Sequence, residues 1–141
     1  VGDGLPGRDI AVRANKPVIA AHLASDSGAA EAMRGARVVA FAGIARPEKF
    51  FRLLEASGAE VAARVSFGDH RRFTQRDYAA LSTLRQEQGA RLVTTEKDAA
   101  RMGGRMATLG VDTLPVTLVF DDPAVLDEAL RGLCKARRSE P

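Results

Sequence analysis

Two short polar clusters hold the residues of this chain that could do chemistry. They are FGDHRRF at 67–73 and LVTTEKD at 92–98. Each follows a stretch typical of a buried strand and precedes one typical of a helix, and open α/β sheets collect their functional groups at such strand ends. Asp69 and His70 are the candidate catalytic pair, because an imidazole can pass or hold a proton near neutral pH and a neighbouring carboxylate can fix its tautomer. The alternative is that Asp69 caps the turn and His70 lies on the surface.

Cationic and hydroxyl side chains in the same clusters are candidates for substrate binding. Arg71 and Arg72 could meet phosphate oxygens through forked hydrogen bonds, although a solvated basic turn is an equally ordinary interpretation. Thr95 and Lys97 follow a strand directly and could face a cleft. The competing interpretation is that 95–98 simply caps the helix that follows.

Strand and helix signals alternate along the chain, which indicates βαβ units and a mainly parallel sheet. We therefore expect an α/β fold of three layers, Rossmann-like, with helices on both faces of the sheet. Residues 37–43 are almost continuously apolar, as in a central strand that is covered on both sides. The expected strands are 17–23, 37–43, 60–67, 91–94 and 116–120. At 141 residues the chain is expected to be a single domain, with a connecting or edge region at about 1–35 and a core at 36–135.

No G-x-x-x-x-G-K-[ST] motif occurs, so the sequence lacks a P-loop, the loop of backbone amides and lysine that cradles a nucleotide's phosphates. Gly2, Gly4 and Gly7 match G-x-G-x-x-G, but only Val1 stands before them to represent a strand. A turn leading into a helix explains these glycines better than a dinucleotide site. The start at Val1, without an initiator methionine, is expected for a piece of a longer protein.

Composition narrows the class of protein further. The net charge is only +3, and basic residues are mixed with acidic ones, so nucleic-acid binding is not expected. The longest apolar run, 38–45, is far shorter than the roughly 18 residues needed to cross a bilayer. One cysteine and two histidines do not make a structural zinc site, and the cysteine count fits a reducing compartment.

Three motifs in order resemble one family. They are AFAGI-x-x-P-x-K-F-F at 40–51, F-x-D-H-x-x-F-T at 67–74 and TTEKDA at 94–99. From about Val18 to Leu130 the chain resembles the C-terminal half of tetraacyldisaccharide 4'-kinase, the lipid A 4'-kinase of Gram-negative bacteria. Two positions depart from the family pattern: Ala45 stands where a second glycine is usual, and Gly68 where a proline is common. Neither change removes a titratable group.

The resemblance implies a kinase of lipid A biosynthesis that transfers the ATP γ-phosphate to the 4'-hydroxyl of tetraacyldisaccharide 1-phosphate. It implies that ATP and Mg²⁺ are bound mainly by an N-terminal domain, which also supplies an aspartate as catalytic base. His70 would pair with that base across the cleft, and Asp69 would orient His70 or its loop. The implied location is the cytoplasmic face of the inner membrane, reached through the full-length protein, and the piece alone is expected to be soluble and inactive.

Two other functions remain open at this point. The chain could be a non-catalytic α/β module that binds a ligand or regulates a partner. It could also be an unrelated nucleotide-binding oxidoreductase that uses Gly2, Gly4 and Gly7.

Overall fold

The computed structural model describes residues 5–14, 18–69 and 71–136, and it divides into two compact units. The central unit is Ser25–Val116, and the terminal unit combines Val1–Ala24 with Thr117–Pro141. These limits differ from the expected division at residue 35. The number of domains stays a prediction, and each unit is described below by itself.

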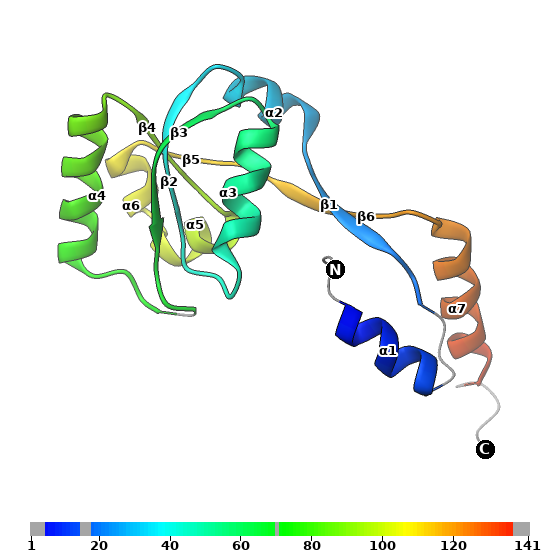
Figure 1. Cartoon of the computed structure of the whole chain (residues 1–141). Coiled ribbons are helices and arrows are strands. Elements are labelled where there is room, and N and C mark those ends of the chain that lie inside the picture. Colours follow the sequence, from blue (N-terminus) through cyan, green and yellow to red (C-terminus); the bar gives the residue numbers. More distant parts are fainter. Residues whose placement is uncertain (1–4, 15–17, 70, 137–141) are drawn as a thin grey trace. The chain divides into compact units, whose positions relative to one another are not determined.

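A four-stranded, all-parallel sheet forms the centre of the central unit (Figure 1). Its strand order is β3-β2-β4-β5, and helices lie on both faces, which confirms the expected α/β class. The elements in chain order are α2 (Ser27–Met33), β2 (Arg37–Ala42), α3 (Pro47–Ala56), β3 (Glu60–Ser66), α4 (Gln75–Gln88), β4 (Arg91–Thr94), α5 (Glu96–Met102), α6 (Arg105–Leu109) and β5 (Val111–Thr113).

The strand order contains a point at which the chain reverses its direction of travel across the sheet. From β2 the chain passes through α3 to β3 on one side, and from β3 it returns through α4 to β4 on the other side of β2. The loops that follow β2 and β4 therefore diverge at neighbouring strand ends. In open α/β sheets, ligands bind in the crevice outside the carboxyl ends of the strands at such a switch point.

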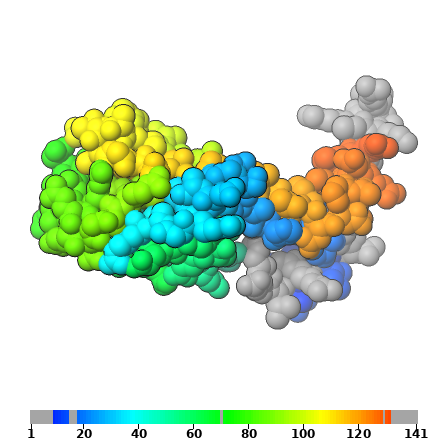
Figure 2. Space-filling view, turned by 90° about the horizontal axis from the view of Figure 1, so that it is seen from above, coloured from blue at the N-terminus to red at the C-terminus, as the bar shows by residue number. Residues whose placement is uncertain are grey.

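The hydrophobic core has two layers because side chains of β2 alternate between the two faces of the sheet. Val38, Ala40 and Ala42 pack with Phe51 and Leu54 of α3 on one face. On the other face, a second cluster joins β2 to α4, α5 and α6 through Val39, Phe41, Tyr78, Leu81, Met102, Met106 and Leu109. α3 and α4 lie on opposite sides of the sheet in Figure 1, and Figure 2 shows the yellow surface of α5 and α6 beside the green surface of α4. The β2 side chains from Val38 to Ala42 are fully buried, as the apolar run at 37–43 predicts.

Local sequence explains where the two large helices begin and end. Pro47 opens α3 in its first turn, where the missing N–H is not needed. Thr74 and Asp77 form a capping box at the start of α4, and Gly89 ends that helix in the left-handed conformation, at φ 55°.

The terminal unit contains two helices and most of a two-stranded sheet: α1 (Leu5–Arg13), β1 (Ala21–Ser25), β6 (Val116–Phe120) and α7 (Pro123–Ala136). The Asp121 N–H donates to the Ala20 carbonyl and the Asp26 N–H to the Pro115 carbonyl. From the first of these bonds to the second, the residue number rises on the β1 side and falls on the β6 side. β1 and β6 are therefore antiparallel.

The strand expected at 116–120 is present, but it does not join the parallel sheet. The position beside β4 is taken instead by β5, whose sequence Val-Asp-Thr is too short and polar to be expected as a strand. α2 likewise lies within the segment of about 1–35 that was expected only as a connecting or edge region. Among the described residues, no helix combines the length and the apolar character needed to span a membrane.

Candidate functional site

Loops from three neighbouring strands meet at the carboxyl edge of the parallel sheet. Gly43 follows β2, Gly68 follows β3, and Asp98 lies in the first turn of α5, directly after β4. A Cβ atom built on Gly43 would lie 3.1 Å from Asp98 Oδ1 and 3.6 Å from the Gly68 carbonyl oxygen. A side chain at this position would therefore crowd the Asp98 carboxylate, whereas its contact with Gly68 would be an ordinary van der Waals one. The two polar clusters predicted from sequence thus lie at the same edge, as parallel strands require.

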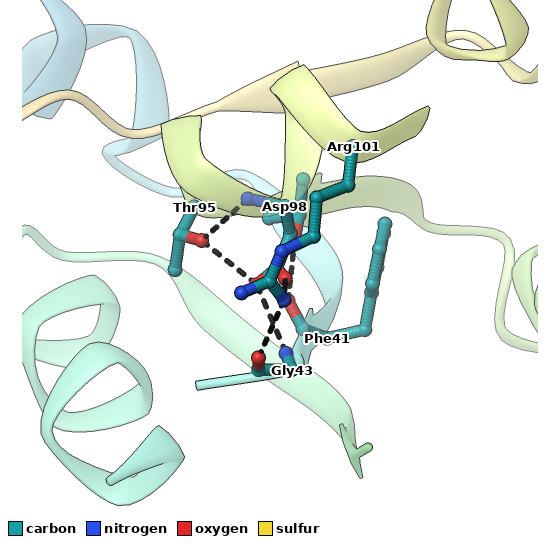
Figure 3. A network of polar contacts seen from close by, with 6 residues as sticks. Phe41, Gly43, Thr95, Asp98 and Arg101 are labelled. Atoms are coloured by element: carbon teal, nitrogen blue, oxygen red, sulfur yellow. Dashed lines mark hydrogen bonds and ion pairs between the residues drawn. The ribbon is translucent and has the colours of Figure 1, made fainter. Parts of the chain in front are cut away.

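The carboxylate of Asp98 is the centre of a buried polar network (Figure 3). Its Oδ2 accepts hydrogen bonds from the Gly43 N–H at 2.9 Å and from the Thr95 hydroxyl at 2.8 Å. Its Oδ1 accepts from Arg101 Nη1, also at 2.9 Å. The same Nη1 donates to the Gly43 carbonyl at 2.8 Å, so both polar groups of this glycine are bound by one ion pair.

Burial makes this network costly to disrupt. Asp98 is 0% exposed, and the Arg101 side chain is 20% exposed. A buried carboxylate is tolerated only when it is paired and its oxygens are hydrogen-bonded, and both conditions hold here. We refer to Gly43, Thr95, Asp98 and Arg101 below as the clamp.

Both threonines of the TTEKDA motif have structural partners. Thr94 is fully buried and donates its hydroxyl to the Phe41 carbonyl at 2.7 Å. Thr95 is 8% exposed and caps α5, because its oxygen accepts from the Asp98 N–H at 3.1 Å while its hydroxyl donates back to the carboxylate. The interpretation of this segment as a helix cap is therefore correct, whereas Lys97 is exposed at the same helix start.

The loop after β3 places its predicted residues in different environments. Asp69 is exposed, and His70 lies outside the described residues. Arg71 donates to both carboxylate oxygens of Asp77, at 2.7 and 2.6 Å, and its guanidinium lies 5.6 Å from the centre of the Phe67 ring. Arg72 is exposed.

The carboxyl group of Asp77 is strongly hydrogen-bonded at the start of α4. The Thr74 hydroxyl and the Thr74 N–H each donate to Asp77 Oδ2 at 2.7 Å. These bonds, with a smaller contribution from Arg71, hold the pKa of Asp77 below its usual value of 3.8. Asp77 therefore stays ionised at neutral pH and anchors Arg71.

Of the four clamp residues, only Thr95 was a candidate site residue from the sequence; Gly43, Asp98 as a buried anion and Arg101 as its partner were missed. A signal for the pair was present, because an acid and an arginine three positions apart share a helix face. Among the residues that the structure describes, no group of three histidine, cysteine or acidic side chains could hold a metal ion.

A parallel α/β unit whose strand-end loops converge at a switch point defines the class of doubly wound α/β proteins. Comparison with known families identifies the particular one. The model of the family "Tetraacyldisaccharide-1-P 4'-kinase" matches residues 5–135, and the chain belongs to this family.

Three curated relatives with similar sequences are each longer than this chain. The tetraacyldisaccharide 4'-kinase of Bradyrhizobium sp. (strain BTAi1) is 42% identical over all of the chain and 43% of its own length. The enzyme of the same name from Nitrobacter winogradskyi is 44% identical over 98% of the chain and 43% of its own length. The one from Methylorubrum populi is 46% identical over 92% of the chain and 40% of its own length. The chain thus spans less than half the length of these relatives, and no solved structure shows significant similarity to it.

Proposed function

We propose that this chain is the C-terminal half of a two-domain tetraacyldisaccharide 4'-kinase of lipid A biosynthesis. The full-length enzyme would transfer the γ-phosphate of ATP to the 4'-hydroxyl of tetraacyldisaccharide 1-phosphate. The observation that carries this proposal is the family match across residues 5–135, which includes all three strand-end motifs. In the absence of a P-loop, the N-terminal domain would bind ATP and Mg²⁺.

His70 is the proposed catalytic residue of this half. Phosphoryl transfer is catalysed mainly by positioning and electrostatics. A histidine that is hydrogen-bonded to the catalytic base could orient that base and share the proton removed from the sugar hydroxyl. Asp69, exposed in the loop directly before His70, is proposed to orient it.

The proposed substrate contacts differ in how readily they could reach a phosphate. Arg72 and Lys97 are both exposed at the carboxyl edge of the sheet, which suits them to phosphate oxygens of the lipid or of ATP. Arg71 would have to exchange its bonds to Asp77 for bonds to substrate, and the Thr95 hydroxyl would have to leave Asp98. We therefore rank Arg72 and Lys97 above Arg71 and Thr95 as substrate-binding residues.

The proposed setting of the enzyme is the cytoplasmic face of the inner membrane, where its lipid substrate lies. Association would be peripheral and would involve the full-length protein. The 141-residue chain alone is expected to show no ATP-dependent phosphorylation of the disaccharide.

Steady-state kinetics of the full-length enzyme test this assignment. We expect His70→Ala to lower kcat by about 10²- to 10⁴-fold, the usual loss for an acid-base partner, with little change in the KM for ATP. His22→Ala serves as the control, because it changes the other histidine of these 141 residues and should leave kcat unchanged. Near wild-type kcat in His70→Ala would show that the Asp-His motif is structural, and turnover by the isolated 141-residue chain would refute the division of labour between the two halves.

A further inference from the structure

The TTEKDA motif presents two kinds of side chain at one strand end. Glu96 and Lys97 are exposed, whereas Thr95 and Asp98 are buried at 8% and 0% exposure. The proposed substrate contacts draw on Lys97 and, with a lower rank, on Thr95, but they leave Asp98 without a role. The Asp98 carboxylate makes a contact outside α5: it accepts a hydrogen bond from the N–H of Gly43, 55 residues away in sequence.

The clamp binds both backbone polar groups of Gly43. Asp98 Oδ2 accepts from the Gly43 N–H, and Arg101 Nη1 donates to the Gly43 carbonyl. Gly43 is the first residue after β2, at the switch point, so these two bonds fix where the β2 loop leaves the sheet. The Phe67 N–H donates to the carbonyl of Ala42, the residue before Gly43, at 2.9 Å, and this bond joins the end of β2 to the start of the loop that continues through Gly68 to Asp69 and His70.

Stability alone is a weak explanation for this arrangement. Replacing a buried ion pair by well-packed apolar side chains is often neutral or stabilising, because desolvation offsets much of the charge attraction. What an ion pair with four directional bonds supplies is a fixed geometry. The benefit is largest where a displacement of about 1 Å is expensive, as it is for groups that align a phosphoryl acceptor.

We propose that Asp98 and Arg101 are positioning residues of this kinase: through Gly43 they hold the β3 loop that presents Asp69 and His70. This inference rests on the proposed function. Neither residue is assigned a contact with substrate. Their loss should therefore lower kcat while leaving the KM values for ATP and for the lipid nearly unchanged.

Asp98→Asn in the full-length enzyme is the first test. The amide keeps the shape of the carboxylate, but it has an NH₂ donor in place of one acceptor oxygen. In either orientation this NH₂ faces another donor, which is the Gly43 N–H in one case and Arg101 in the other. We expect kcat to fall about 10- to 100-fold, with each KM changed by less than about threefold. Glu96→Gln is the matched control, an exposed carboxylate in the same helical turn, and should stay within about twofold of wild type.

Arg101 offers a rescue test that a loss of folding would not mimic. One nitrogen, Nη1, donates both to the Gly43 carbonyl and to Asp98 Oδ1. A lysine ammonium has enough donors to replace these two bonds. We expect Arg101→Met to lose about 10- to 100-fold in kcat and Arg101→Lys to recover most of it. This pair also decides the matter if Asp98→Asn does not fold.

Hydrogen exchange of the same proteins provides a readout that needs no substrate. In Asp98→Asn and Arg101→Met, the Gly43 amide should exchange at least about tenfold faster than in wild type. The amides of residues 67–69 should also exchange faster, whereas the exchange rates of β3 and α4 amides should stay unchanged. If wild type has no kinase activity, the proposed function fails and this exchange alone decides the inference. Wild-type kcat, or wild-type exchange at 43 and 67–69 in folded Asp98→Asn, overturns it, as does equal loss in Arg101→Lys and Arg101→Met.

Discussion

The central and terminal units differ in where their large hydrophobic side chains lie. Every hydrophobic residue found buried belongs to the central unit, in two clusters that cover both faces of the parallel sheet. The large hydrophobic side chains found exposed all belong to the terminal unit: Ile10, Val12, Val18, Leu23, Val119, Val125 and Leu130.

This contrast indicates how each unit is stabilised. Burial of apolar surface is the main favourable contribution to folding, so the central unit has its own source of stability. The described side chains of the terminal unit have no comparable burial, and an isolated two-stranded sheet is marginal in water. We therefore expect the terminal unit to open at a lower free energy than the central unit.

The largest expected effect separates the two units directly. Phe51 is fully buried against β2, and Phe51→Ala should lower the free energy of unfolding by about 3–5 kcal/mol. Leu130 is 50% exposed on α7, and Leu130→Ala should change it by no more than about 0.5 kcal/mol. Urea unfolding of the 141-residue chain, followed by far-ultraviolet circular dichroism, measures both. A similar loss in the two variants would mean that the contrast in burial is wrong.

A medium effect is expected at the capping box of α4. Asp77→Asn removes the anion that accepts from Thr74 and Arg71, and the loss of such a cap is worth about 1 kcal/mol at neutral pH. Because the folded pKa of Asp77 lies below the unfolded value near 3.8, this contribution is fully present above about pH 4. It disappears as the pH falls through the folded pKa.

Urea midpoints of wild type and Asp77→Asn at pH 7, 5, 4 and 3 check this pH dependence. The difference between the two proteins should stay constant from pH 7 to 5 and shrink below pH 4. Glu87→Gln, an exposed change near the other end of α4, should show no such trend. A difference that grows on acidification would contradict the lowered pKa.

The contrast also explains which parts of the fold could be predicted from sequence. Strands β2 and β4 were found because a strand buried on both faces is encoded as a local apolar run. β3 is an edge strand with no fully buried residue, and it was found from the alternation of strand and helix signals. β5 has only three residues, one of them Asp112, and is defined by its pairing with β4. No local pattern shows that β6 leaves the parallel sheet for β1, because partner choice depends on residues far apart in sequence.

The candidate site divides in the same way. The cap formed by Thr95 was predictable, because a helix cap depends on residues three positions apart. The burial of Asp98 was not, because it depends on Gly43 and on the packing of three loops. The partner of Arg71 was missed for a related reason: the Asp77 carboxylate, which completes the capping box of α4, also has room for a donor from a residue outside that helix.

The smallest expected effect concerns the polar contact between β1 and β6 in the terminal unit. His22 Nδ1 lies 2.9 Å from Asp121 Oδ1, and the two side chains are 63% and 55% exposed. An exposed pair of this kind is worth about 0–1 kcal/mol and is screened by salt. If the terminal unit is as weakly held as its burial indicates, His22→Ala should speed exchange of the Asp121 amide, which donates to Ala20, by less than about fivefold. The exchange rates of β2 amides should not change at all.

Hydrogen exchange at low and high salt measures these rates. A large, salt-insensitive acceleration would mean that this contact is a main support of the terminal unit, and a simultaneous change in β2 would mean that the two units unfold together.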